Sequence, residues 1–147
     1  MNTDTQVITE VNTIVTHLRP HIDEIVAIVL LRNYGEEKFP GIKKAKIAFW
    51  NAGTTNTENK SWKQHHREGK ILIGVGGSCF DEHPSAATER KEGHCAATLV
   101  AEYLGIQERP ELKKLLKYTL NNDINGGTSE FELAALITLG NKTFWDT

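Results

Sequence analysis

The sequence predicts an α/β fold, a Rossmann-like domain with a parallel sheet and crossover helices. Three short apolar segments read as strands, and they cover residues 11–16, 45–50 and 70–75. The first is rich in β-branched residues, the second alternates, and the third is apolar throughout, as is typical of a strand in the middle of a parallel sheet. The chain has 147 residues, so we expect a single domain over residues 1–147.

The regions between and after these segments predict helices. Residues 22–33 are apolar on nearly every side, which is typical of a buried helix that ends at Gly35. Residues 94–104 have helical spacing, and Gly105 suits the position after a helix end. The polar segment 51–69 predicts a long loop.

Two more helices are expected near the C-terminus. Pro110 suits the first position of a helix that runs to about Leu120. Residues 129–132, Ser-Glu-Phe-Glu, form a capping box that opens a last helix to Leu139, with Gly140 as its end.

The composition excludes several classes of protein. The net charge of −2 argues against a generally basic, nucleic-acid-binding surface. The two cysteines, Cys79 and Cys95, are too few for a disulfide framework, and residues 1–10 lack the apolar core of a secretory signal. The longest apolar run, residues 25–31, is too short to span a bilayer. We therefore expect reduced thiols in a cytoplasmic protein without membrane segments.

Chemically competent side chains follow the first strand. His17, His21, Asp23 and Glu24 fall within eight residues, and ligands of parallel sheets bind beyond the carboxyl ends of the strands. Imidazole suits manganese, zinc and iron, and carboxylate suits harder ions. A turn at Pro20, with its predecessor extended, brings both histidines to one ion and leaves Asp23 to face a second. The alternative is that the two acids only begin a helix, where its dipole favours them.

A second group follows the third strand. Asp81, Glu82 and His83 are three consecutive metal- or proton-competent residues, and the glycines before them allow close approach of backbone to a ligand. The alternative is an ordinary acidic surface loop. Asp123 is a further candidate, and its alternative is a turn residue in a segment rich in Asn and Gly.

Two other features have a functional and an ordinary interpretation. His94 opens a helix whose N-terminus is suited to phosphate, or it is a surface histidine. Residues 60–67 combine cations with an aromatic ring, which suits contact with a nucleotide, or they form a solvated loop. His65 and His66 lie in this segment and could also reach the metal.

In their order along residues 11–127, these motifs resemble the DHH phosphoesterase superfamily, and within it the melanocyte proliferating gene family of metal-dependent exonuclease-like hydrolases. The superfamily's first motif, His-x-x-Pro-Asp-x-Asp, is matched by His-Leu-Arg-Pro-His-Ile-Asp at 17–23. The Asp-Val-Gly-Gly and Asp-His-His of that family are matched by Gly-Val-Gly-Gly at 74–77 and Asp-Glu-His at 81–83. A helix of small residues at 93–100 and an Asp-x-Asn-Gly segment at 123–126 follow.

The resemblance implies a three-layer domain and two-metal hydrolysis of phosphate esters, with Mn²⁺ as the expected ion and Mg²⁺ or Zn²⁺ as alternatives. The implied metal ligands are His17 and His21 for one ion, and Asp23, Asp123 and Glu82 for the other. Asp81 would orient His83, which would contact the phosphate or protonate the leaving group. Arg19 and His94 are the candidate substrate-binding residues.

The chain departs from the family at Gly74, where the family has an aspartate that bridges both metals. Without that carboxylate, the second metal site is expected to be weak or lost. A C-terminal substrate-binding domain is also not expected, so recognition would come from loops, a partner or self-association.

The expected function is metal-dependent hydrolysis of a nucleotide, a cyclic nucleotide or a short oligonucleotide. One alternative is a catalytically inactive DHH-like domain that binds a nucleotide or a protein partner. Another is a structural domain in which the acids and histidines are incidental.

Overall fold

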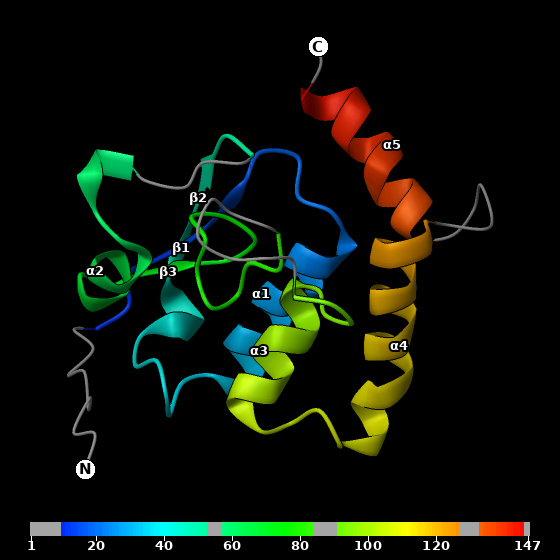
Figure 1. Ribbon diagram of the computed structural model, residues 1–147, viewed down its shortest axis with the longest axis horizontal. Coiled ribbons are helices and arrows are strands. Elements are labelled where there is room, and N and C mark those ends of the chain that lie inside the picture. Colours follow the sequence, from blue (N-terminus) through cyan, green and yellow to red (C-terminus); the bar gives the residue numbers. More distant parts are fainter. Residues whose placement is uncertain (1–9, 53–56, 84–90, 127–132, 146–147) are drawn as a thin grey trace.

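The computed structural model describes residues 10–52, 57–83, 91–126 and 133–145. Figure 1 shows a small sheet beside a group of helices. The elements run in the order β1 (Thr13–His17), α1 (Ile22–Tyr34), η1 (Ile42–Lys44), β2 (Lys46–Trp50), η2 (Thr57–Asn59), α2 (Trp62–Arg67), β3 (Lys70–Leu72), α3 (Ala96–Leu104), α4 (Pro110–Asn125) and α5 (Leu133–Trp145).

The three strands form an open parallel sheet in the order β2-β1-β3, which confirms the α/β class and the parallel sheet. In the described part of the chain, however, β1 is the central strand and β3 is an edge, so the prediction of a middle position for the third strand is wrong. The expected strand to residue 75 ends at Leu72. The chain turns away at Gly74, whose φ is +66° and whose N–H donates to Phe80 O. Ile73 and Val75 are nevertheless buried, which explains why the apolar run extends beyond the end of β3.

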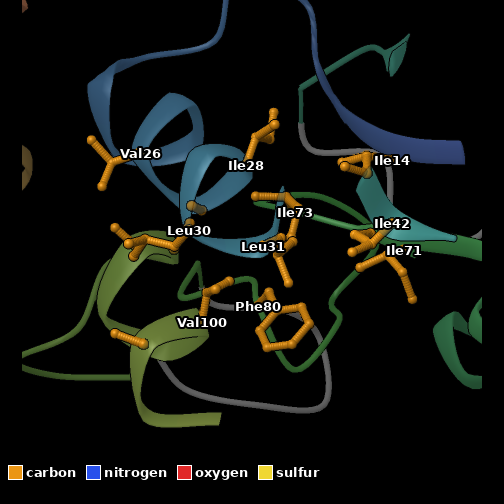
Figure 2. Close-up of a cluster of buried hydrophobic side chains, with 14 of the residues drawn as sticks. Ile14, Val26, Ile28, Leu30, Leu31, Ile42, Ile71, Ile73, Phe80 and Val100 are labelled. Atoms are coloured by element: carbon orange, nitrogen blue, oxygen red, sulfur yellow. The ribbon is translucent and has the colours of Figure 1, made fainter. Parts of the chain in front are cut away.

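Helices lie on both faces of the sheet. Successive side chains of a strand point to opposite faces, so neighbouring residues of one strand belong to different apolar clusters. On one face, Ile14 and Ile71 belong to the main core with side chains of α1 and α3, and Figure 2 shows this cluster. On the other face, Val15 and Leu72 pack with Trp62 at the start of α2. Helix α4 lies against α1 and α3. The result is a three-layer arrangement that is compatible with a Rossmann-like fold.

The segment expected as a long loop contains the six-residue helix α2. The Ser61 hydroxyl accepts a hydrogen bond from Gln64 N at 3.3 Å, and Gln64 Oε1 accepts one from Ser61 N at 3.0 Å. This is a capping box, and its Ser-x-x-Gln pattern is visible in the sequence. A helix of this length is too short to show a periodic apolar face. His65 and His66 are buried, so the interpretation of the segment as a solvated loop is wrong.

Three helix ends agree with the sequence. Gly35 and Gly105 are the C-caps of α1 and α3, and Pro110 begins α4. Helix α4 continues past Leu120, however, to Asn125, whose side-chain amide donates to Asn121 Oδ1 at 2.8 Å. Asp123 therefore lies on a helix and is not a turn residue.

The last helix, α5, runs through Gly140, which was expected to end it. A tertiary contact holds this part of α5, because the Asn141 side-chain amide donates to Pro20 O at 2.9 Å. The predicted capping box at 129–132 lies outside the described residues. No helix among the described residues is both long and apolar enough to cross a membrane.

Candidate metal centre

The candidate site lies where β1 and β3 end side by side. The connection from β1 to β2 runs through α1 on one face of the sheet, and that from β2 to β3 runs through α2 on the other. Open α/β sheets bind ligands beyond the carboxyl ends of their strands. His17 is the last residue of β1, and residues 81–83 follow β3.

The first ligand group consists of His17, His21 and Glu24, whose ligand atoms lie within 4.8 Å of one another. His17 Nδ1 donates to Leu18 O at 2.7 Å, which turns Nε2 toward Glu24 Oε1 at 3.1 Å. The other oxygen of Glu24 accepts a hydrogen bond from His21 N at 2.8 Å, at the start of α1. His17 and Glu24 are buried, whereas His21 is exposed, so the group opens to solvent on the His21 side.

The loop between β1 and α1 creates this group by a sharp reversal. Leu18 N donates to Trp50 O at 2.8 Å and continues the pairing with β2. The next residue, Arg19, has a φ of +57°, so the prediction of an extended Arg19 is wrong. Because the chain reverses within the few residues between strand and helix, the rings of His17 and His21 come to 5.4 Å between centroids. The Arg19 side chain is exposed beside them.

The second ligand group consists of Asp23, Glu82 and Asp123, whose oxygens also lie within 4.8 Å of one another. They come from α1, from the loop after β3 and from α4. Asp23 and Glu82 are 1% and 0% exposed, and Asp123 is half-buried. Asp23 Oδ2 accepts a hydrogen bond from Ala96 N at the start of α3, at 3.4 Å. Asp23 Oδ1 and both oxygens of Glu82 accept no hydrogen bond from the described residues.

The electrostatics of the second group show a shortage of positive charge. Burial raises the pKa of Glu82 to about 7, and the charges of Asp123 and Glu24 add to the rise. Burial also raises the pKa of Asp23, with further contributions from Glu24, Asp123 and Glu82. For Glu24, hydrogen bonds from His17 and Asp23 outweigh the effect of burial and lower the pKa. Burial and the neighbouring carboxylates disfavour the charged forms of Asp23 and Glu82, so a bound cation would stabilise those charged forms.

The burial and charge of this region also shift the pKa of His17. Burial alone would lower the pKa of His17, but the hydrogen bond and the charge of Glu24 raise it. Since Nδ1 already donates to a carbonyl, Nε2 is the nitrogen that remains for a metal. A histidine ligand is commonly oriented in this way, by a hydrogen bond from its other ring nitrogen.

A pair formed by Asp81 and His83 lies next to the second group. Asp81 Oδ1 accepts hydrogen bonds from His83 Nδ1 at 2.9 Å and from His83 N at 3.1 Å, and its Oδ2 accepts one from Gly77 N at 3.0 Å. His83 Nε2 lies 3.6 Å from Glu82 Oε1. The hydrogen bond to Asp81 raises the pKa of His83 to about 9. The His83 side chain is 51% exposed, so a proton on this ring is accessible from solvent.

The remaining histidines lie in other surroundings. His94 is half-buried, and its ring nitrogens lie 3.3 Å from Thr98 Oγ1 and 3.9 Å from Glu102 Oε1, both on α3. His66 Nε2 accepts a hydrogen bond from Leu72 N at 3.1 Å and so supports β3. The His65 ring lies 5.1 Å from that of Trp50. Both histidines of α2 thus contribute to packing against the sheet.

Glu24 was among the four competent side chains noted after the first strand, but it was not among the metal ligands that the resemblance implied. Its carboxylate lies between His17 and the backbone of His21. The signal was present, because an acid three residues after the N-cap folds back toward the start of the helix. In this chain the start of the helix is also the site.

Comparison with protein-family models, with curated proteins and with solved structures gave no match for this chain.

Proposed function

We propose that this protein is a metal-dependent phosphoesterase of the DHH type that hydrolyses a nucleotide, a cyclic nucleotide or a short oligonucleotide. The observation that carries the proposal is the second ligand group. Its buried oxygens on Asp23 and Glu82 accept no hydrogen bond from the described residues, and they point to a common centre with Asp123. Buried charges in proteins are paired or coordinate metals, and Glu82 has an ion-pair contact with His83 Nε2 at 3.6 Å.

The chemistry of the donor set fits a transition metal. Imidazole nitrogens of His17 and His21 combine with the carboxylate of Glu24 in one group, and three carboxylates form the other. Mixed nitrogen and oxygen ligands suit Mn²⁺, Zn²⁺ or Fe²⁺, and carboxylates alone suit Mg²⁺ or Mn²⁺. Mn²⁺ is the ion that fits both groups, and it is the ion that the resemblance to the DHH superfamily implies.

Bound metal ions would supply an activated water and neutralise charge on the phosphate. The chain's own residues contribute orientation and proton transfer. Asp81 holds the His83 ring by Nδ1, which leaves Nε2 at the accessible edge of the site. From there, Nε2 donates a proton to the leaving oxygen of the ester, as a general acid does. Arg19 is exposed on the loop that carries His17 and His21, and it supplies a cation for phosphate oxygens.

Assignment to the DHH type is supported by the order of the motifs and by where they lie. The first motif ends β1 and opens α1, the Gly-Gly segment and the Asp-Glu-His triplet follow β3, and Asp123 comes from α4. Three segments that are distant in the sequence thus contribute to one centre. An incidental set of surface acids and histidines would have no reason to be buried together, so the structural-domain alternative has less support.

The test is Mn²⁺-dependent hydrolysis of bis-para-nitrophenyl phosphate by the wild type and by the His21→Ala and His83→Ala variants. We expect turnover that EDTA abolishes. Loss of a general acid costs about 10²–10⁴-fold in rate, so His83→Ala should fall in this range while it still binds metal. His21→Ala should lose metal affinity as well. Circular dichroism of each variant checks that it is folded.

A second function is favoured by one observation, the glycine at position 74. If folded wild-type protein shows no turnover with Mn²⁺, Mg²⁺ or Zn²⁺, the hydrolase proposal is wrong. The protein would then be an inactive DHH-like domain, and calorimetric titration with nucleotides in EDTA should detect metal-independent binding.

A further inference from the structure

We propose that the carboxylate of Glu24 joins the two ligand groups into one binuclear centre and replaces a carboxylate at the strand end, where the chain has Gly74. This inference rests on the proposed function and concerns the number of ions and the ligand that connects them. It reverses the expectation that a chain without a strand-end aspartate has lost its second metal position.

The contacts of Glu24 reach both groups. Toward the first, Oε1 lies 3.1 Å from His17 Nε2, and Oε2 is fixed by His21 N at 2.8 Å. Toward the second, Glu24 raises the pKa of Asp23, and its charge adds to the raised pKa of Glu82. A side chain that is 1% exposed and has neighbours on both sides is in the place of a shared ligand.

The position of Gly74 explains how this carboxylate comes to be there. A Cβ atom at residue 74 would lie 2.9 Å from Glu24 Oε1 and 3.0 Å from Glu24 Cγ. These separations are too short for both groups to keep their places, so a side chain at 74 and the present position of Glu24 exclude each other. The chain fills the space beside the end of β3 from α1. The carboxylate beside the end of β3 therefore comes from α1 and not from residue 74.

The consequence is a pair of ions held close together. A carboxylate shared by two cations typically holds them about 3.5–4 Å apart. Two Mn²⁺ ions at such a distance are exchange-coupled through the bridging oxygens, and their electron paramagnetic resonance signal differs from that of isolated ions. The number of bound ions and the coupling between them can be measured without any substrate.

The experiment compares wild type with Glu24→Gln, which keeps the size of the side chain and removes its charge. Glu36→Gln is the matched control, since the Glu36 carboxylate also accepts backbone hydrogen bonds, from Gly41 N at 2.9 Å and Lys43 N at 3.2 Å, and is exposed. Bound Mn²⁺ is counted by elemental analysis after desalting, and coupling is read from the resonance spectrum. We expect two coupled ions in wild type and in Glu36→Gln. In Glu24→Gln we expect no coupled signal and affinity for at least one ion about 10–100-fold weaker.

Each outcome separates this inference from the proposed function. A coupled pair of ions that persists in folded Glu24→Gln overturns the inference. A single bound ion in an active wild type also overturns it. Neither result contradicts the proposed hydrolase function. If wild type binds no ion and shows no turnover, both fail. If Glu24→Gln does not fold, Glu24→Asp takes its place, because it keeps the charge and withdraws the carboxylate by one methylene. Loss of coupling in that variant supports the inference, and an unchanged coupled signal overturns it.

Discussion

Glu82 Oε1 lies 3.6 Å from His83 Nε2, yet the Glu82 carboxylate is fully buried and accepts no hydrogen bond from the described residues. His83 Nδ1 is instead bonded to Asp81. Glu82 is thus placed where it can bind a cation, at a cost to the stability of the metal-free protein.

Glu82→Gln should therefore stabilise the metal-free protein at high pH. The pKa of Glu82 is raised to about 7, so folding favours the protonated acid. Its contribution to stability is present at low pH and is lost as the pH rises from the ordinary pKa of a glutamate through about 7. Above pH 8 we expect the variant to gain about 1–3 kcal/mol in the free energy of unfolding. Urea unfolding in EDTA at pH 6 and pH 8.5 measures this difference.

The same substitution should remove stabilisation by metal. Mn²⁺ at a hundred times its dissociation constant should raise the free energy of unfolding of the wild type by about 2.7 kcal/mol for one site. The same Mn²⁺ concentration should raise the free energy of unfolding of Glu82→Gln much less. Glu108→Gln is the control, because Glu108 is exposed on the surface. Equal gains in Glu82→Gln and wild type would show that Glu82 is not a ligand.

Asp81→Asn should lower the pKa of His83 in the metal-free protein. The hydrogen bond from His83 to Asp81 is the largest cause of the raised pKa, about 9, and the charge of Asp81 adds to it. An amide keeps the size of the side chain but not the charge, so the His83 pKa should move toward its ordinary value. Titration of the histidine ring protons by NMR in EDTA gives the result. A His83 pKa that stays near 9 in the variant would mean that Asp81 does not control it.

Protonation of His66 should lower the stability of the folded protein in mild acid. Burial, with the nearby His65, lowers the pKa of His66 to about 4, and its Nε2 must be unprotonated to accept the hydrogen bond from Leu72 N. Its contribution to stability is complete above the unfolded value of 6.5 and is lost as the pH falls from there toward 4. Between pH 7.5 and 5 we expect a loss of about 2 kcal/mol from this residue.

Other groups also titrate in this range, so the effect of His66 is isolated by difference. His66→Gln retains an acceptor for Leu72 N and cannot take up a proton. Denaturant unfolding at several pH values should show that the difference in the free energy of unfolding between wild type and variant becomes smaller as the pH falls. If the difference is the same at pH 7.5 and 5, the imidazole is not held neutral.

Gly74→Ala should damage both the fold and the metal centre. The φ of +66° is unfavourable for alanine, and the new methyl group would lie 2.9 Å from Glu24 Oε1. Gly105→Ala is the matched control, because its φ is +70° and nothing lies within 4 Å of the added carbon. Backbone strain alone should cost about 1–2 kcal/mol in each.

The difference between the two alanine variants reports on the contact with Glu24. We expect a larger loss of stability in Gly74→Ala and, by calorimetric titration, weaker Mn²⁺ binding. Gly105→Ala should bind Mn²⁺ as wild type does. Similar Mn²⁺ affinity in both variants would show that Glu24 moves aside without consequence for the metal.

Elements with a local cause could be predicted from the sequence. The β-branched run before His17 is strand β1, the apolar run after Ile22 is helix α1, and Gly105 and Pro110 mark helix boundaries. Strand ends in a parallel sheet point to one edge, and this rule nominated the segments after β1 and β3, whereas Asp123 on α4 follows no strand. The chemical types of the candidate ligands are also a property of the sequence.

Features that depend on neighbours from distant segments could not be predicted in this way. Ile73 N still donates to Val15 O of β1 at 2.8 Å, and Val75 is buried although the chain turns away from the sheet at Gly74. Helix α5 passes through Gly140 where Asn141 bonds to Pro20. Asp123 comes within 4.8 Å of Asp23 and Glu82, measured between carboxylate oxygens, because α4 continues to Asn125. Glu24 is distinguished from an ordinary helix-opening acid because its side chain fills the space that Gly74 leaves, a relation between α1 and the end of β3 that no local pattern encodes.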